Sequence, residues 1–197
     1  MSRNQWGLFA LGLMAVMGTW PRETWAAEPN PVVAIRTENA SGLAGLAGIN
    51  LARAQELTTD IYARAGVTLQ WITDERAPAK RTLTIILTTI ATAPPGIAPE
   101  SMGVAPSPGD GTRGTTAYIF LDKVASFVAA NRVAAEYVLA CALAHEIGHL
   151  LLPPNAHDDS GIMRGSWHPG LFPPKAPGVP GFPPAQARLL RLRAGGR

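Results

Sequence analysis

The chain is short of cysteine, which excludes one way of stabilising a small fold. Its single cysteine, Cys141, has no partner in the chain, so an internal disulfide is excluded. Cys141 lies in the apolar run 138–143, and we interpret it as a small buried residue of a core helix. The alternative is a thiolate ligand or nucleophile, which no second cysteine and no neighbouring cation support.

Charge is scarce as well. Charged residues make up 16% of the sequence, and the basic ones are scattered except at the C-terminal end. Four arginines fall among the last ten residues, where they are typical of the last turn of a helix. A nucleic-acid-binding protein usually gathers its positive charge on one element with aromatic residues between. We therefore expect no nucleic-acid partner.

The apolar run 6–17 is too short to cross a bilayer as a stable anchor. It carries no charge and follows Arg3, the arrangement typical of a secretory signal peptide. Cleavage after Ala26 would place Thr24 and Ala26 at the two positions that must be small. We predict a signal peptide over 1–26 and a mature chain that is periplasmic or extracellular, without a stable membrane anchor.

The mature chain, 27–197, has the length of one domain. Apolar runs rich in β-branched residues predict strands at 31–36, 67–72, 81–88 and 115–121, with a short edge strand at 102–105. Apolar periodicity predicts helices at 43–65, 131–152 and 184–193. The order of these elements implies an α/β (α+β) fold with a mixed, mainly parallel sheet and helices packed on it.

The predicted helix 131–152 carries the residues that point to chemistry. His145 and His149 are four residues apart, so on a helix both rings lie on one face and can reach one ion. Zinc accepts imidazole nitrogens in tetrahedral geometry. Glu146 follows the first histidine, and in this HExxH pattern its carboxylate takes the proton from the attacking water. The motif predicts a zinc hydrolase.

A third ligand is needed to complete such a site. No glutamate follows Glu146, so a glutamate ligand from a later helix is excluded within this chain. The remaining candidates are His157, Asp158, Asp159 and His168. We favour His157, because a chain that breaks at 153–154 and folds back can return it to the metal, and because imidazole is the commoner ligand.

The segment 144–163 resembles the metzincin metallopeptidases, through HEIGH, a later histidine and Gly161-Ile162-Met163. It is more closely similar to uncharacterised exported bacterial metzincin-like proteins. The resemblance implies a twisted sheet with an antiparallel edge strand, a backing helix, an active-site helix and an irregular C-terminal part ending in a helix. It also implies that Met163 packs under the metal without binding it. The stretch 101–111 resembles the edge strand, which in that family pairs with an extended substrate.

The sequence departs from the metzincin pattern in the turn after the helix. Leu152 stands in place of the turn glycine, and Asn155 stands in place of the third ligand, two residues before His157. The pair 153–154 is Pro-Pro, and proline cannot supply a positive φ. No tyrosine closely follows the methionine, so Arg164 is the candidate for stabilising an oxyanion, against its interpretation as a solvated turn residue.

These observations predict an exported, monomeric zinc metalloendopeptidase that acts on peptide or protein substrates. Its ligands are His145, His149 and His157, its base is Glu146, and Met163 forms the floor of the site. Two other functions are compatible with the same residues. One is a zinc-binding or interaction domain that has lost turnover, and the other is a zinc hydrolase of a non-protein amide.

Overall fold

The computed structural model describes residues 29–40, 49–72, 82–108, 113–172 and 179–196. The predicted signal peptide, the first part of the predicted helix 43–65 and residue 81 lie outside these ranges. Within them, no helix is long and apolar enough to cross a bilayer.

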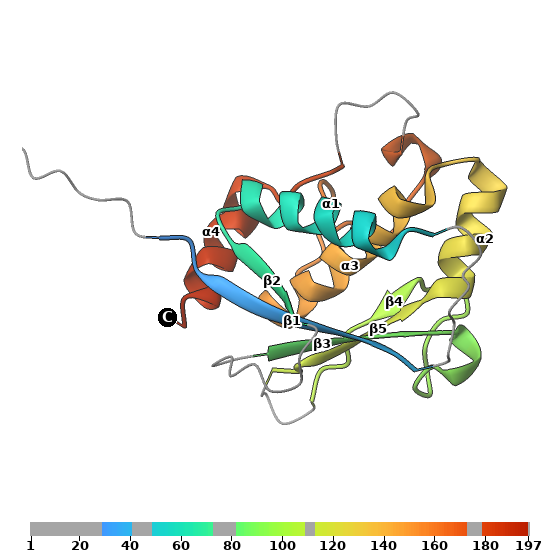
Figure 1. Ribbon diagram of the computed structural model, residues 1–197, viewed down its shortest axis with the longest axis horizontal. Helices are drawn as coiled ribbons and strands as arrows, with labels where there is room; N and C mark the ends of the chain where they lie inside the picture. Colours follow the sequence, from blue (N-terminus) through green and yellow to red (C-terminus); the bar gives the residue numbers. More distant parts are fainter. Residues whose placement is uncertain (1–28, 41–48, 73–81, 109–112, 173–178, 197) are drawn as a thin grey trace, which may run out of the picture.

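One five-stranded sheet forms the base of the fold, in the order β2-β1-β3-β5-β4 (Figure 1). Its strands are β1 (Val32–Asn39), β2 (Thr68–Ile72), β3 (Thr82–Thr88), β4 (Gly103–Val104) and β5 (Thr116–Phe120). Neighbours pair in parallel except β4, which runs antiparallel to β5, with Val104 opposite Tyr118. The predicted mixed, mainly parallel sheet with an antiparallel edge strand is thus confirmed.

Four α-helices accompany the sheet among the described residues: α1 (Leu51–Arg64), α2 (Leu121–Asn131), α3 (Ala135–Leu151) and α4 (Pro184–Ala194). Two short 3₁₀ turns, Ile90–Thr92 and Pro169–Leu171, lie in the connections. Helices α1 and α3 pack side by side on one face of the sheet, and α4 lies near the end of α1 (Figure 1). The predicted C-terminal helix is confirmed, and it follows an irregular stretch as expected.

In the described part of the chain, residues 49 and 50 are not helical and α1 begins at Leu51, inside the predicted range 43–65. Asn50 is extended, and its side chain accepts a hydrogen bond from the backbone N–H of Arg53 at 3.1 Å, which caps the first turn. At the other end Gly66 has φ +76°, the left-handed conformation that favours glycine, as predicted.

The prediction of one helix over 131–152 is wrong at its beginning. Helix α2 ends when Arg132 adopts a left-handed conformation, with φ 55° and ψ 41°, and α3 starts only at Ala135. Helix α2 itself was not predicted, because β5 passes directly into it at Phe120 without a glycine or proline between. The end of α3 agrees with the prediction, since Pro153 disfavours a helical conformation of Leu152.

Helix α3 is the central element of the fold. Its residues from Val138 to Gly148 are all buried between the sheet, α1 and α2. The Tyr62 hydroxyl of α1 donates to the carbonyl of Ala144 at 2.9 Å, and the Thr58 hydroxyl, which donates to the carbonyl of Ala54 at 2.7 Å, also lies 3.3 Å from the carbonyl of Ala140. These hydrogen bonds set the position of α3, and therefore of the histidines it carries, relative to α1.

Candidate metal centre

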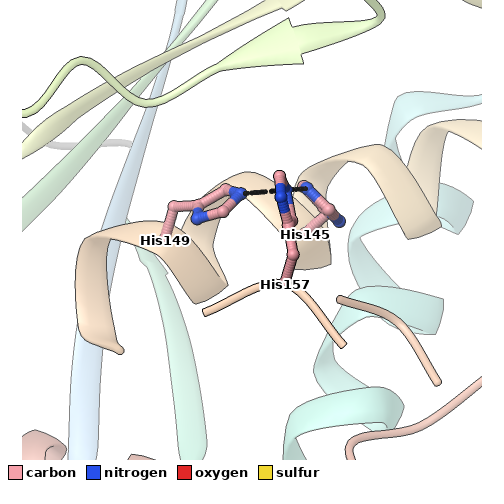
Figure 2. A group of neighbouring side chains, drawn as sticks. All are labelled: His145, His149 and His157. Atoms are coloured by element: carbon pink, nitrogen blue, oxygen red, sulfur yellow. Dashed lines mark hydrogen bonds between the residues drawn. The ribbon is translucent and has the colours of Figure 1, made fainter. Parts of the chain in front are cut away.

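Three histidines converge at the C-terminal end of α3. His145 and His149 project from successive turns of the helix, and His157 returns from the following loop to face them (Figure 2). Their Nε2 atoms are 3.0 Å apart for 145 and 149, 3.1 Å for 149 and 157, and 3.3 Å for 157 and 145. The structure thus brings together the three predicted ligands as a group that can hold a metal ion.

The spacing of these nitrogens fits a small tetrahedral cation. Nitrogens about 2.0–2.1 Å from a tetrahedral metal lie about 3.3 Å from one another. The ring orientation agrees, because Nδ1 of His145 donates to the carbonyl of Ile162 at 2.9 Å and leaves its Nε2 unprotonated in the neutral ring. A cation at the centre would relieve the repulsion between lone pairs that face one another at this distance.

The two histidines of α3 are in the neutral protonation state, which is the one that binds metal ions. Burial lowers the pKa of His145, and the hydrogen bond to Ile162 opposes this only in part. Burial, followed by the neighbouring rings of His145 and His157, lowers the pKa of His149 to about 4. Both imidazoles are therefore neutral at pH 7, so a metal ion need not displace a proton.

The loop that returns His157 takes a path that the glycine-turn pattern would not suggest. After the two prolines, Asn155 has φ 59°, so this asparagine provides the left-handed residue that a glycine provides elsewhere. Asp158 then donates its backbone N–H to the carbonyl of Met163 at 2.9 Å, and its Oδ1 accepts from the N–H of Ser160 at 3.1 Å. These bonds close a compact turn between His157 and Met163.

The other ligand candidates are not part of the histidine group. The Asp158 carboxylate is engaged by Ser160 and by Gln186, within its own loop and with α4. Asp159 and His168 are exposed and do not belong to the cluster of potential ligand atoms. Met163 is fully buried, with its Sδ against Gly148 of α3. It therefore packs on the helix that bears His145 and His149.

Glu146 points away from solvent towards the sheet edge. Its side chain is buried, and a Cβ on Gly103 of β4 would lie 2.7 Å from its Cγ and 2.9 Å from its Oε1. Burial raises the pKa of Glu146 to about 8. Its Oε2 atom is buried and has no hydrogen-bond partner among the described residues. A buried unpaired carboxylate oxygen is rare in folded proteins and is typical of groups with a chemical role.

Aromatic and polar residues surround the histidines on the loop side. Trp167 packs edge-on against His145, with ring centroids 5.7 Å apart, and Phe172 packs behind Trp167 at 5.8 Å. A cavity of about 580 Å³ opens beside His157, lined by His157, Asp158, Asp159, Arg164, Gly165 and Ser166. Arg164 therefore faces a space next to the third histidine, which is compatible with contact to a bound ligand.

Two neighbours of the site were not foreseen. Gly103 leaves room for the Glu146 side chain, and Gln186 contacts the loop on both sides of His157. Neither is marked by a local pattern, since each acts through a contact with a distant part of the chain. The only sequence signal at Gly103 was its place in a predicted edge strand.

Comparison of the chain with protein-family models, with curated proteins and with solved structures finds no match. The geometry of the site and the motif it carries are therefore the basis for inferring a function.

Proposed function

We propose that this protein is an exported zinc metallopeptidase of the metzincin type. In this proposal His145, His149 and His157 hold the metal and Glu146 is the general base. The observation that carries it is that the three Nε2 atoms lie 3.0–3.3 Å from one another, beside a buried glutamate whose Oε2 has no hydrogen-bond partner among the described residues. An all-imidazole, tetrahedral donor set favours zinc among the common divalent ions.

A bound zinc ion would polarise the substrate carbonyl and lower the pKa of water. The residues of the chain supply the remaining functions. Glu146 Oε2, which has no partner in the described part of the chain, accepts the proton of the attacking water and delivers it to the nitrogen of the leaving amine as the C–N bond breaks. Close positive charge lowers the pKa of a carboxyl group, so a bound cation would bring the pKa of Glu146 down from about 8.

The edge strand β4 is the proposed binding surface for the substrate backbone. It is the last strand of the described sheet and pairs only with β5, so its outer edge can add an extended peptide. Glu146 packs against Gly103 of the same strand, so a peptide bound there would lie beside the proposed base. An extended peptide or protein segment is therefore the proposed substrate.

The proposal is tested by metal analysis and hydrolysis assays on purified protein of residues 27–197. We expect about one zinc per chain in the wild type and in Glu146→Ala, and loss of zinc in His149→Ala. Glu146→Ala should reduce peptide hydrolysis by about 10²–10⁴-fold. Equal hydrolysis by wild type and Glu146→Ala would remove Glu146 from the mechanism.

The same assays separate the two other functions. A wild type that holds zinc but cleaves nothing in a broad peptide library would favour a binding domain without turnover. Cleavage of cell-wall fragments in place of proteins would favour a hydrolase of a non-protein amide. Export is tested separately, by N-terminal sequencing of the protein expressed with residues 1–26, where we expect a mature chain beginning at Ala27.

A further inference from the structure

We propose that Gln186 of α4 is a positioning residue for the third metal ligand, His157. The inference rests on the proposed metal site, because it concerns how the geometry of the three ligands is maintained. Two ligands project from the rigid helix α3, whereas His157 lies on an exposed loop that follows two prolines. The loop therefore needs support from another element if the third imidazole is to stay in place before the metal arrives.

The Gln186 amide provides this support on both sides of His157. Its Nε2 donates to the carbonyl of Ala156 at 3.0 Å and lies 3.4 Å from Oδ2 of Asp158. A primary amide has two N–H groups, so one nitrogen can serve both acceptors. The two residues that it contacts are the immediate neighbours of His157 in the chain, so the contacts restrict the backbone from which the imidazole projects.

The contact reaches further through Asp158. This residue also accepts from the N–H of Ser160 at 3.1 Å and donates its own N–H to the carbonyl of Met163 at 2.9 Å. Gln186 is therefore joined through one aspartate to the turn that ends at Met163. A change at Gln186 should disturb the position of His157 and leave His145 and His149, which α3 holds, in place.

The burial of Gln186 indicates that its orientation is set by the loop. The side chain is 8% exposed, and its Oε1 atom is buried without a hydrogen-bond partner among the described residues. Turning the amide over would bring Oε1 against the oxygens of Ala156 and Asp158 and would repel both. A buried oxygen without a hydrogen-bond partner is costly. The two hydrogen bonds that the amide nitrogen donates offset this cost, which accounts for an amide side chain at this buried position.

Helix α4 is itself held in position by hydrogen bonds to other parts of the fold. Arg191, further along the helix, donates to the carbonyl of Ala65 at the end of α1 at 2.9 Å. Just before the helix, the carbonyl of Gly181 accepts from the N–H of Ile162 at 2.9 Å. Figure 1 shows α4 beside the end of α1, away from the sheet edge at β4. Helix α4 thus connects the loop that bears His157 to the end of α1.

The test compares Gln186→Leu and Gln186→Glu with wild type in the chain 27–197. Zinc affinity is measured by competition with a chromogenic chelator, the coordination geometry by the visible spectrum of the cobalt-substituted protein, and stability by thermal unfolding of the metal-free form. Gln186→Leu should weaken zinc binding about 10–100-fold and alter the cobalt spectrum. Gln186→Glu should bind more weakly still, because a carboxylate would face two oxygens.

Leu190→Ala is the matched control. Leu190 lies on the same helix, is fully buried in the main core and makes none of the hydrogen bonds to the loop. Leu190→Ala should lower the thermal midpoint while changing zinc affinity by less than about twofold, because substitutions at sites that share no contacts have independent effects. If Gln186→Leu does not fold, Gln186→Met, which keeps the length of the side chain, is measured in its place.

The inference is overturned if Gln186→Leu or Gln186→Met lowers the thermal midpoint but keeps the zinc affinity and cobalt spectrum of the wild type. Such a result would make Gln186 a purely structural residue of α4. A wild type that binds no zinc would instead overturn the proposed function itself. The two failures are therefore distinguished by a single measurement on the unmodified protein.

Discussion

The sulfur of Met163 occupies the place that a side chain at Gly148 would need. An ideal Cβ on Gly148 would lie 2.5 Å from Sδ of Met163 and 3.5 Å from Cε1 of Phe182. Gly148 stands directly before His149 on α3, and Met163 ends the turn that begins after His157. The loop can pack this closely on the histidine helix only because the helix lacks a side chain at that position.

Gly148→Ala should therefore destabilise the protein, against the usual trend. In an unobstructed helix this change stabilises by up to about 1 kcal/mol. Here the added methyl collides with a fully buried side chain, and overpacking of this kind costs about 1–3 kcal/mol. Urea unfolding of the metal-free protein measures the difference, and we expect weaker zinc binding as the loop moves away.

A double-mutant cycle with Met163→Ala shows whether the collision is the cause. Met163→Ala alone should cost about 2–5 kcal/mol, because it leaves a cavity. In the double variant the methyl of residue 148 has room, so the two effects should fall short of additivity by about 1–3 kcal/mol. Strictly additive effects would mean that Gly148 and Met163 do not compete for the same space.

A second prediction concerns the hydrogen bonds that hold α3 to α1. Tyr62→Phe removes the hydroxyl that donates to the carbonyl of Ala144, the residue before His145. The carbonyl keeps its bond within the helix, so the loss should be about 0.5–1.5 kcal/mol in the free energy of unfolding. Tyr118→Phe is the control, since its hydroxyl has no hydrogen-bond partner in the part of the chain that the structure describes. Equal effects of the two substitutions would contradict the role given to Tyr62.

Local patterns in the sequence account for the elements that have clear boundaries. Gly66 adopts the positive φ expected of a helix end, and β4 stops before Pro106 as predicted. Helix α2 was missed because its boundary with β5 falls at Phe120-Leu121, an apolar pair without a turn residue. Periodicity cannot locate a junction where an apolar strand continues directly into an apolar helix.

In the candidate site, too, some residues could be predicted from local patterns and others could not. The pairing of His145 and His149 follows from helical spacing alone, so it could be predicted without knowledge of the fold. His157 could be predicted from the chain break at 153–154 and from its residue type, while its actual path depends on the left-handed conformation of Asn155. The roles of Gly103 and Gln186 could not be predicted, because they depend on contacts between elements that are distant in sequence.

A third prediction is that Cys141 is unreactive in the folded protein. Its side chain is fully buried, and burial raises the pKa of the thiol to about 12. The thiol therefore stays protonated at any pH below that value, and only the thiolate reacts. At pH 8 iodoacetamide should not label the native protein, but should label it within minutes in guanidinium chloride. Cys141→Ala should keep its zinc, whereas loss of zinc would revive the thiolate-ligand alternative.

The last prediction separates metal binding from proton transfer. Gly103→Ala would place a methyl 2.7 Å from Cγ of Glu146 and 2.9 Å from the carbonyl of Tyr118. Because the methyl would also meet a backbone carbonyl of β5, both the β4 backbone and the glutamate side chain have to shift, while the three histidines lie elsewhere. Zinc content should therefore stay at the wild-type level while hydrolysis falls at least about tenfold, because a displaced base transfers protons poorly.

Gly181→Ala provides a comparison for this glycine substitution, because the nearest described atom to a Cβ at that position is Nε of Arg64, 4.0 Å away. It should change neither zinc content nor hydrolysis by more than about twofold. If Gly103→Ala lost zinc together with activity, the edge strand would be supporting the histidine group as well as the base. If it kept full activity, the contact between Gly103 and Glu146 would have no part in placing the carboxylate, and the proposed alignment of a substrate along β4 would lose its main structural support.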